Sequence, residues 1–277
     1  SDVCSSDLLE LDADVTLRVG SIDVSAGSVT LGGGATHINA TGDVRLEQQL
    51  TMTALGSPTS FVVGGELYIG ASVTVMGEVH LNATTMNLTS SGSVVGTGGS
   101  HSSDGQGPSG SVPTSQYGAG SHGGAGTKSE AHTSDSNWGA SYGSTFHPTE
   151  VGAGSQNAKG GAALRVTADT VTLSGSIVVN GDVRAAGGSV WVTTRLLLGS
   201  GGAISAIGGD GTQNTNRAGG GGGRVAVYCE TTEYVGTFAG FSGLPDVSVS
   251  GGRSSNGRSE EHTSELQSPM YLVCRLL

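Results

Sequence analysis

The chain has 277 residues, 50 of them glycine, and a formal net charge of −11 at pH 7. Only 12 residues are Lys or Arg, against 23 Asp or Glu, which excludes the basic, phosphate-neutralising surface that nucleic-acid binding needs. No apolar run approaches the roughly 20 residues of a membrane-spanning helix, so we predict no membrane span in this fragment.

The two ends of the chain resemble translated DNA from a common short-read library adapter. Residues 1–8 read SDVCSSDL and residues 258–269 read RSEEHTSELQSP. The first string can be encoded by TCAGACGTGTGCTCTTCCGATCT, the reverse complement of a sequence that can encode the start of the second. We therefore interpret residues 1–8 and 258–277 as adapter artefacts, exclude them from fold reasoning and expect them to pack poorly.

This interpretation changes the cysteine and charge balance. Cys4 and Cys274 fall in the adapter-like ends, so only Cys229 remains, and it is interpreted as a structural or unpaired thiol. Eighteen acidic and ten basic residues remain, a net charge of −8. With neither a start methionine nor a signal peptide in view, we expect an internal fragment of a longer protein.

Apolar pairs separated by one residue recur along the chain, which is the period of a β-strand. They stop near residue 98 and resume near residue 161, with Gly, Ser, Asn or Asp in most gaps. In chain order the pairs are Val15/Leu17, Ile22/Val24, Val29/Leu31, Val44/Leu46, Leu50/Met52, Leu67/Ile69, Val73/Val75, Val79/Leu81, Met86/Leu88, Leu164/Val166, Val171/Leu173, Ile177/Val179, Val190/Val192, Leu196/Leu198 and Val225/Val227.

The pairs repeat at regular offsets. Ile22, Val44 and Leu67 follow one another at 22 and 23 residues, and residues 161–181 align on residues 188–208, with Leu164 and Val190 at an offset of 26. Such periods predict an all-β, right-handed parallel β-helix (β-solenoid) of short strands, with the apolar pairs stacked inward and glycine allowing left-handed corners.

The composition divides the chain into five parts. They are residues 1–8 (adapter artefact), 9–98 (N-terminal β-solenoid coils), 99–160 (a long Gly/Ser-rich insertion, read as a loop or lid or as a disordered segment), 161–257 (C-terminal β-solenoid coils) and 258–277 (adapter artefact).

Three glycine-rich motifs carry a family resemblance. They are Ser121–Gly124 (SHGG), Tyr142-Gly143-Ser144 with Pro148, and Gly219–Tyr228 (GGGGGRVAVY). Over about residues 98–228 the chain resembles glycine-rich secreted or cell-surface β-helix-like proteins of plants, algae and other protists. The resemblance implies an extracellular or cell-surface location; most of that family has no assigned activity.

Candidate chemistry is sparse, and we predict no catalytic, cofactor-binding or metal-binding residue. Gly118–Gly123 matches GxGxxG but lacks the flanking strand and helix of a dinucleotide site. His122 and His147 are interpreted as solvent-exposed loop histidines in preference to a metal site. The acids Asp169, Asp182 and Asp210 form no adjacent pair such as a carbohydrate-active enzyme would use.

Some residues are candidates for a surface role. The offset of 26 places Asp169 beside Arg195 as an ion pair, and Arg165 beside Trp191 as a cation–π contact on the outer face. Arg165 and Trp191, together with Trp138 and Tyr142, form the predicted ligand surface. Asn-x-Ser/Thr sequons predict glycosylation, if the protein is secreted, at Asn39, Asn82 and Asn87.

These features favour a fragment of a non-enzymatic extracellular or cell-wall-associated structural or adhesive protein. Its partners would be cell-wall polysaccharide or other surface proteins. The alternative is a carbohydrate-active β-helix enzyme, related in chemistry to polysaccharide lyases or glycoside hydrolases. Ice binding would need a regular outward TxT array, which the sequence lacks.

Overall fold

A computed structural model gives the fold of the chain. It describes residues 9–12, 16–19, 21–24, 29–32, 37–53, 59–98, 119–126, 141–155, 158–211, 218–238, 241–243, 245–253 and 271–274. Every regular element among them is a β-strand. All strand pairings are parallel except for one short hairpin.

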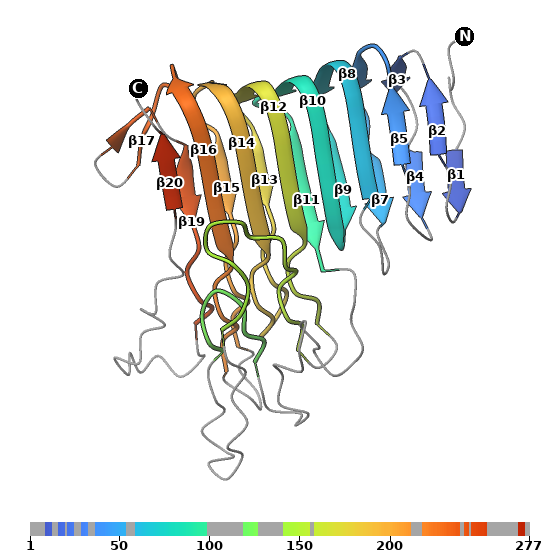
Figure 1. The fold of residues 1–277 in the computed structure, drawn as a ribbon. Helices are drawn as coiled ribbons and strands as arrows, with labels where there is room; N and C mark the ends of the chain where they lie inside the picture. The colour runs from blue at the N-terminus through green and yellow to red at the C-terminus, as the bar shows by residue number, and fades with distance from the viewer. Residues whose placement is uncertain are drawn as a thin grey trace.

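The strands form two layered parallel sheets (Figure 1). The eight-stranded sheet contains, in spatial order, β1 (Leu9–Asp12), β4 (Val29–Gly32), β7 (Leu50–Thr53), β9 (Ser72–Met76), β11 (Ser93–Thr97), β13 (Ser176–Val178), β15 (Ala203–Ser205) and β19 (Asp246–Ser248). From β7 to β16 the chain alternates between this sheet and the ten-stranded one.

The ten-stranded sheet contains the longer strands. Its order is β2 (Thr16–Val19), β5 (His37–Ala40), β8 (Thr59–Ile69), β10 (Glu78–Leu88), β12 (Ala163–Leu173), β14 (Ser189–Leu198), β16 (Arg224–Thr232) and β20 (Tyr271–Cys274), with β3 (Ile22–Val24) and β6 (Val44–Leu46) completing it beside β8. The hairpin is β17 (Thr237–Phe238) with β18 (Phe241–Ser242).

The predicted right-handed parallel β-helix, or β-solenoid, is wrong as the architecture. The all-β, parallel-strand content holds, but the strands are organised as two layered parallel sheets rather than as coils of short strands. One reason is that two apolar pairs, Val79/Leu81 and Met86/Leu88, lie on a single strand: β10 runs for 11 residues without a turn between them. The partner strand β8 is also 11 residues long, and it takes up one extra residue between Val63 and Glu66, opposite Ala83 and Thr85, without ending.

The repeat offsets are confirmed as strand registers. Ile22 pairs with Val44, and Val44 with Leu67, at the predicted offsets of 22 and 23. Strand β12 pairs with β14 from Ala163↔Ser189 onward, at the predicted offset of 26.

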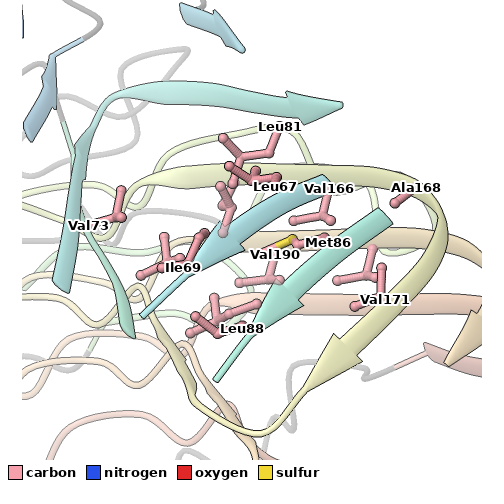
Figure 2. Packing of buried hydrophobic residues seen from close by; sticks show 14 of the residues in the cluster. Leu67, Ile69, Val73, Leu81, Met86, Leu88, Val166, Ala168, Val171 and Val190 are labelled. Atoms are coloured by element: carbon pink, nitrogen blue, oxygen red, sulfur yellow. The ribbon is translucent and has the colours of Figure 1, made fainter. Parts of the chain in front are cut away.

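The core lies between the two sheets and consists mainly of aliphatic side chains in register columns (Figure 2). One column joins Val79, Leu164, Val190 and Val225 across four adjacent strands, and each of these side chains is at most 1% exposed. Stacking identical positions in parallel register lets branched side chains pack on one another without gaps.

One apolar pair faces the other way. Leu197 takes the inward position of β14, opposite Val171, so Leu196 and Leu198 lie partly exposed on the outer face. The inward stacking predicted for the pair Leu196/Leu198 is therefore wrong, because three consecutive leucines cannot share one face of a strand.

Glycine-rich segments pack together beyond the strand ends, at the bottom of Figure 1. We call them the glycine bundle: residues 119–126, 151–155, 158–161, 179–188, 206–211, 218–223 and 249–253. Successive amides point in different directions: Ala186 N–H donates to Ala153 (2.8 Å) and Gly187 N–H to Gly221 (3.0 Å) in two other segments, and Gly188 N–H donates to Val179 (2.7 Å) at the start of its own segment. This pattern fits the three residues per turn of a polyproline II conformation, whereas a strand alternates between two sides.

Close approach explains the glycines of this bundle. A Cβ at Gly221 would overlap the carbonyl oxygen of Gly124. The described glycines with positive φ are Gly77, Gly143, Gly199, Gly201 and Gly243, and none of these lies in the bundle. Here glycine serves mainly to let backbones touch, and not to make the left-handed corners that the sequence suggested.

The predicted divisions can be compared with the strand positions. Strands β1 to β11 lie within residues 9–98 and β12 to β19 within 161–257, while the described parts of 99–160 contain no strand longer than an isolated bridge. Residues 1–8, 254–270 and 275–277 are outside the described part of the chain. Strand β20 pairs in parallel with β16, so this part of the C-terminal stretch joins the sheet, against the expectation of poor packing.

Candidate ligand-binding face

A row of aromatic and arginine side chains crosses the outer face of the ten-stranded sheet. Arg165 on β12 is in register with Trp191 on β14, and the guanidinium carbon lies 4.2 Å from the Trp191 ring centroid. Both side chains point outward because their neighbours along each strand are buried. The predicted cation–π contact is confirmed.

The loop at residues 141–151 adds a second layer to this row. The His147 ring lies 4.9 Å from Trp191, inclined by 59°, and 6.4 Å from Tyr228 on β16, inclined by 26°. The Tyr228 hydroxyl donates a 2.7 Å hydrogen bond to the carbonyl of Phe146, which is itself 51% exposed. We call Arg165, Trp191, His147 and Tyr228 the aromatic row.

A buried polar cluster holds that loop in place. His122 and Ser189 are completely buried, and Arg224 is 5% exposed. The His122 Nδ1 donates a 2.7 Å hydrogen bond to the Gly187 carbonyl, because a carbonyl oxygen can only accept. The centroid of the His122 ring lies 4.9 Å from that of Tyr142. We call His122, Tyr142, Ser189 and Arg224 the His122 cluster.

Each member of the cluster ties one segment to another. Arg224 Nε donates to the Tyr142 carbonyl at 2.9 Å, and the Ser189 hydroxyl donates to the Glu150 carbonyl at 2.6 Å. Gly143 has a φ of +81° and sits against this cluster, where a side chain would be strained. The loop is thus anchored at both ends beside the aromatic row.

Electrostatics keep the His122 cluster in one protonation state. The pKa of His122 is lowered to about 4: burial is the main cause, the hydrogen bond to Gly187 opposes it, and the nearby Arg224 charge adds to the lowering. Burial, aided by the Glu150 charge, raises the pKa of Tyr142. Burial lowers the pKa of Arg224. His122 is therefore a neutral imidazole at pH 7 and not the solvent-exposed histidine that the sequence suggested.

The three motifs that carried the family resemblance meet in this cluster. SHGG contributes His122, the Tyr142-Gly143-Ser144 element contributes Tyr142, and the oligoglycine motif contributes Arg224. The polar side chains of these motifs connect glycine-rich segments that have almost no other side chains with which to contact one another.

The predicted ligand surface is only partly assembled. Arg165 and Trp191 share the outer face, but Tyr142 lies in the buried cluster, where its hydroxyl donates to the Val151 carbonyl at 2.6 Å. Trp138 lies outside the described residues. Sequence reasoning missed His147 and Tyr228 as members of the face, although Tyr228 ends the oligoglycine motif.

The three sequon asparagines differ in their surroundings. Asn39 and Asn82 are exposed on outward positions of β5 and β10. Asn87 is partly buried, and its Nδ2 donates to Glu66 Oε1 at 3.2 Å. The side chains of Asn39 and Asn82 are therefore accessible to a glycosylating enzyme, whereas that of Asn87 is held in a hydrogen bond.

The acids named from the sequence have local structural roles. Within the glycine bundle, Asp182 accepts a hydrogen bond from the Lys159 amide (3.3 Å) and Asp210 accepts one from the Arg253 amide (2.6 Å). Asp169 and Arg195 make no ion pair with each other, so that predicted contact is wrong. In the described ranges no three His, Cys, Asp or Glu residues gather as a metal site.

Cys229 is disulfide-bonded, so of the two interpretations, a structural or an unpaired thiol, the unpaired one is wrong. The parallel register of β16 and β20 places Cys274 directly opposite Cys229. The side chain of Cys229 is 4% exposed at the edge of the core.

No family model, curated protein or solved structure matches this chain. No helix long and apolar enough to cross a membrane occurs in the part of the chain that the structure describes.

Proposed function

We propose that this chain belongs to a non-enzymatic structural or adhesive protein of the extracellular space or cell wall, and that it binds wall polysaccharide. The observation that carries the proposal is the aromatic row on the outer face of the ten-stranded sheet. Aromatic and arginine side chains are the residues most enriched where proteins bind partners, because they bury large areas with few rotatable bonds.

The rigidity of the face supports this proposal. The row stands on adjacent parallel strands with a fully buried column beneath it, and the His122 cluster fixes the loop that supplies His147. A preorganised face loses little conformational entropy when an extended polymer lies on it. Pyranose rings present C–H faces that pack on such side chains.

Depletion of the full-length protein by insoluble wall polysaccharides tests the proposal. We expect Trp191→Ala to weaken binding at least tenfold. Leu198→Ala is the matched control, since it removes a partly exposed apolar side chain from the outer face of the same strand, and it should bind like the parent. Absence of binding to every wall polysaccharide would overturn the proposal.

The same samples test the enzymatic alternative. Soluble polysaccharide incubated with the protein should yield neither new reducing ends nor unsaturated products. Product formation that scales with protein concentration would favour the carbohydrate-active enzyme over the adhesive protein.

We also propose that residues 1–8 and 258–277 derive from a sequencing adapter. Untrimmed transcript reads across both junctions test this. Transcripts that carry unrelated sequence beyond both junctions support the adapter origin, and genomic DNA that encodes both ends contiguously refutes it.

A further inference from the structure

The outer face carries two arginines stacked on aromatic rings, and they differ in one respect. The Arg45 guanidinium carbon lies 4.0 Å from the Tyr68 ring centroid, and the Arg165 guanidinium carbon lies 4.2 Å from that of Trp191. Arg45 also binds a carboxylate: its Nε and Nη2 donate to Glu47 Oε1 at 2.8 and 2.5 Å. The first pair thus shows how a carboxylate sits on a ring-stacked arginine in this sheet.

Arg165 stacks on an aromatic ring as Arg45 does, but it binds no carboxylate in the described part of the chain. Among the described residues no Asp or Glu oxygen lies within 4 Å of its guanidinium, and its buried Nε has no hydrogen-bond acceptor. The adjacent buried Trp191 Nε1 also lacks an acceptor. A buried N–H without an acceptor costs about 1–3 kcal/mol, so a ligand carboxylate that reached either donor after a small shift of the covering atoms would recover this energy.

Neighbouring acids do not fill this role. The residue in register with Arg165 on β10 is His80, which already pairs with Glu78 at 2.8 Å. The chain is also acidic overall, with a net charge of −11, yet it leaves this arginine without a counter-ion among the described residues.

We propose that Arg165 binds a carboxylate group of an acidic polysaccharide, with Trp191 packing against the sugar ring that bears it. This inference rests on the proposed function and names the substrate class. An arginine held flat on an aromatic ring presents its N–H groups in a fixed fork that matches a carboxylate. The acidic remainder of the chain would repel a polyanion, which confines binding to this site.

Affinity electrophoresis of the full-length protein in gels containing polygalacturonate, dextran sulfate or neutral dextran tests the inference. We expect polygalacturonate to retard the parent protein most. Arg165→Gln should weaken that interaction at least tenfold, and Arg165→Lys should restore part of it, since the charge returns without the fork. Arg45→Gln is the matched control: it removes the same charge from another ring-stacked arginine on this face and should change binding less than twofold.

Several results would overturn the inference. They are equal losses in Arg45→Gln and Arg165→Gln, which would indicate net charge alone; unchanged binding in both Arg165 variants; and stronger retardation by dextran sulfate than by polygalacturonate. Binding to neutral wall polysaccharides without any binding to polygalacturonate would overturn this inference and leave the proposed function standing. Absence of binding to any polysaccharide would overturn both.

Discussion

Acidification should loosen the His122 cluster before it affects the core. His122 is completely buried, and its pKa is lowered to about 4 from an ordinary value of 6.5. Between pH 6.5 and 4 the unfolded chain takes up a proton at this residue and the folded chain does not. The free energy of unfolding must therefore fall as the pH falls through this window, and His122 adds no further loss well below pH 4.

The size of this effect follows from the pKa. Each pH unit between 6.5 and about 4 removes about 1.4 kcal/mol, so His122 takes away about 3 kcal/mol in all. Typical domains are stable by about 5–15 kcal/mol, so one histidine accounts for a measurable share of the acid sensitivity.

Urea unfolding followed by circular dichroism at pH 7.5, 6, 5 and 4 measures it. His122→Gln keeps a donor for the Gly187 carbonyl but cannot titrate. Its stability should decrease by about 3 kcal/mol less than that of the parent over this range. His147→Gln, which removes an exposed histidine, should follow the parent. Parallel pH profiles for the parent and His122→Gln would refute the reasoning, whatever the stability of the variant at pH 7.5.

Two further predictions concern glycine packing and the sequons. Gly187→Ala should lower the melting temperature more than Gly201→Ala. A Cβ at Gly187 would overlap a neighbouring carbonyl oxygen, whereas a Cβ at Gly201 would meet open space and only the φ of +67° opposes a side chain there. Equal decreases of the melting temperature in a thermal scan would contradict this. Upon secretory expression in a eukaryotic host, peptide mass spectrometry should find glycans at Asn39 and Asn82 but not at Asn87, which donates to a glutamate. Full occupancy at Asn87 would show that this hydrogen bond does not protect it.

Local period and spacing were enough to predict the strand content and much of the register. Pairs such as Val44/Leu46 and Leu67/Ile69 place one face of each strand inward, and their offsets equal the pairing in the sheet. The Arg165–Trp191 contact followed from the same alignment, because residues in register on parallel strands stand side by side.

The sequence by itself determined that this protein is all-β and parallel, since a period of two and a regular offset depend only on neighbours along the chain. Only the tertiary structure decided how the strands are layered: it joins the pairs Val79/Leu81 and Met86/Leu88 in the single strand β10, and the partner strand β8 accommodates one extra residue opposite Ala83 and Thr85. It also brought His122, Tyr142 and Arg224 together from three distant glycine-rich motifs. Glycine segments have no side-chain periodicity to reveal their neighbours, so the buried cluster beside the aromatic row could not be predicted from the order of residues.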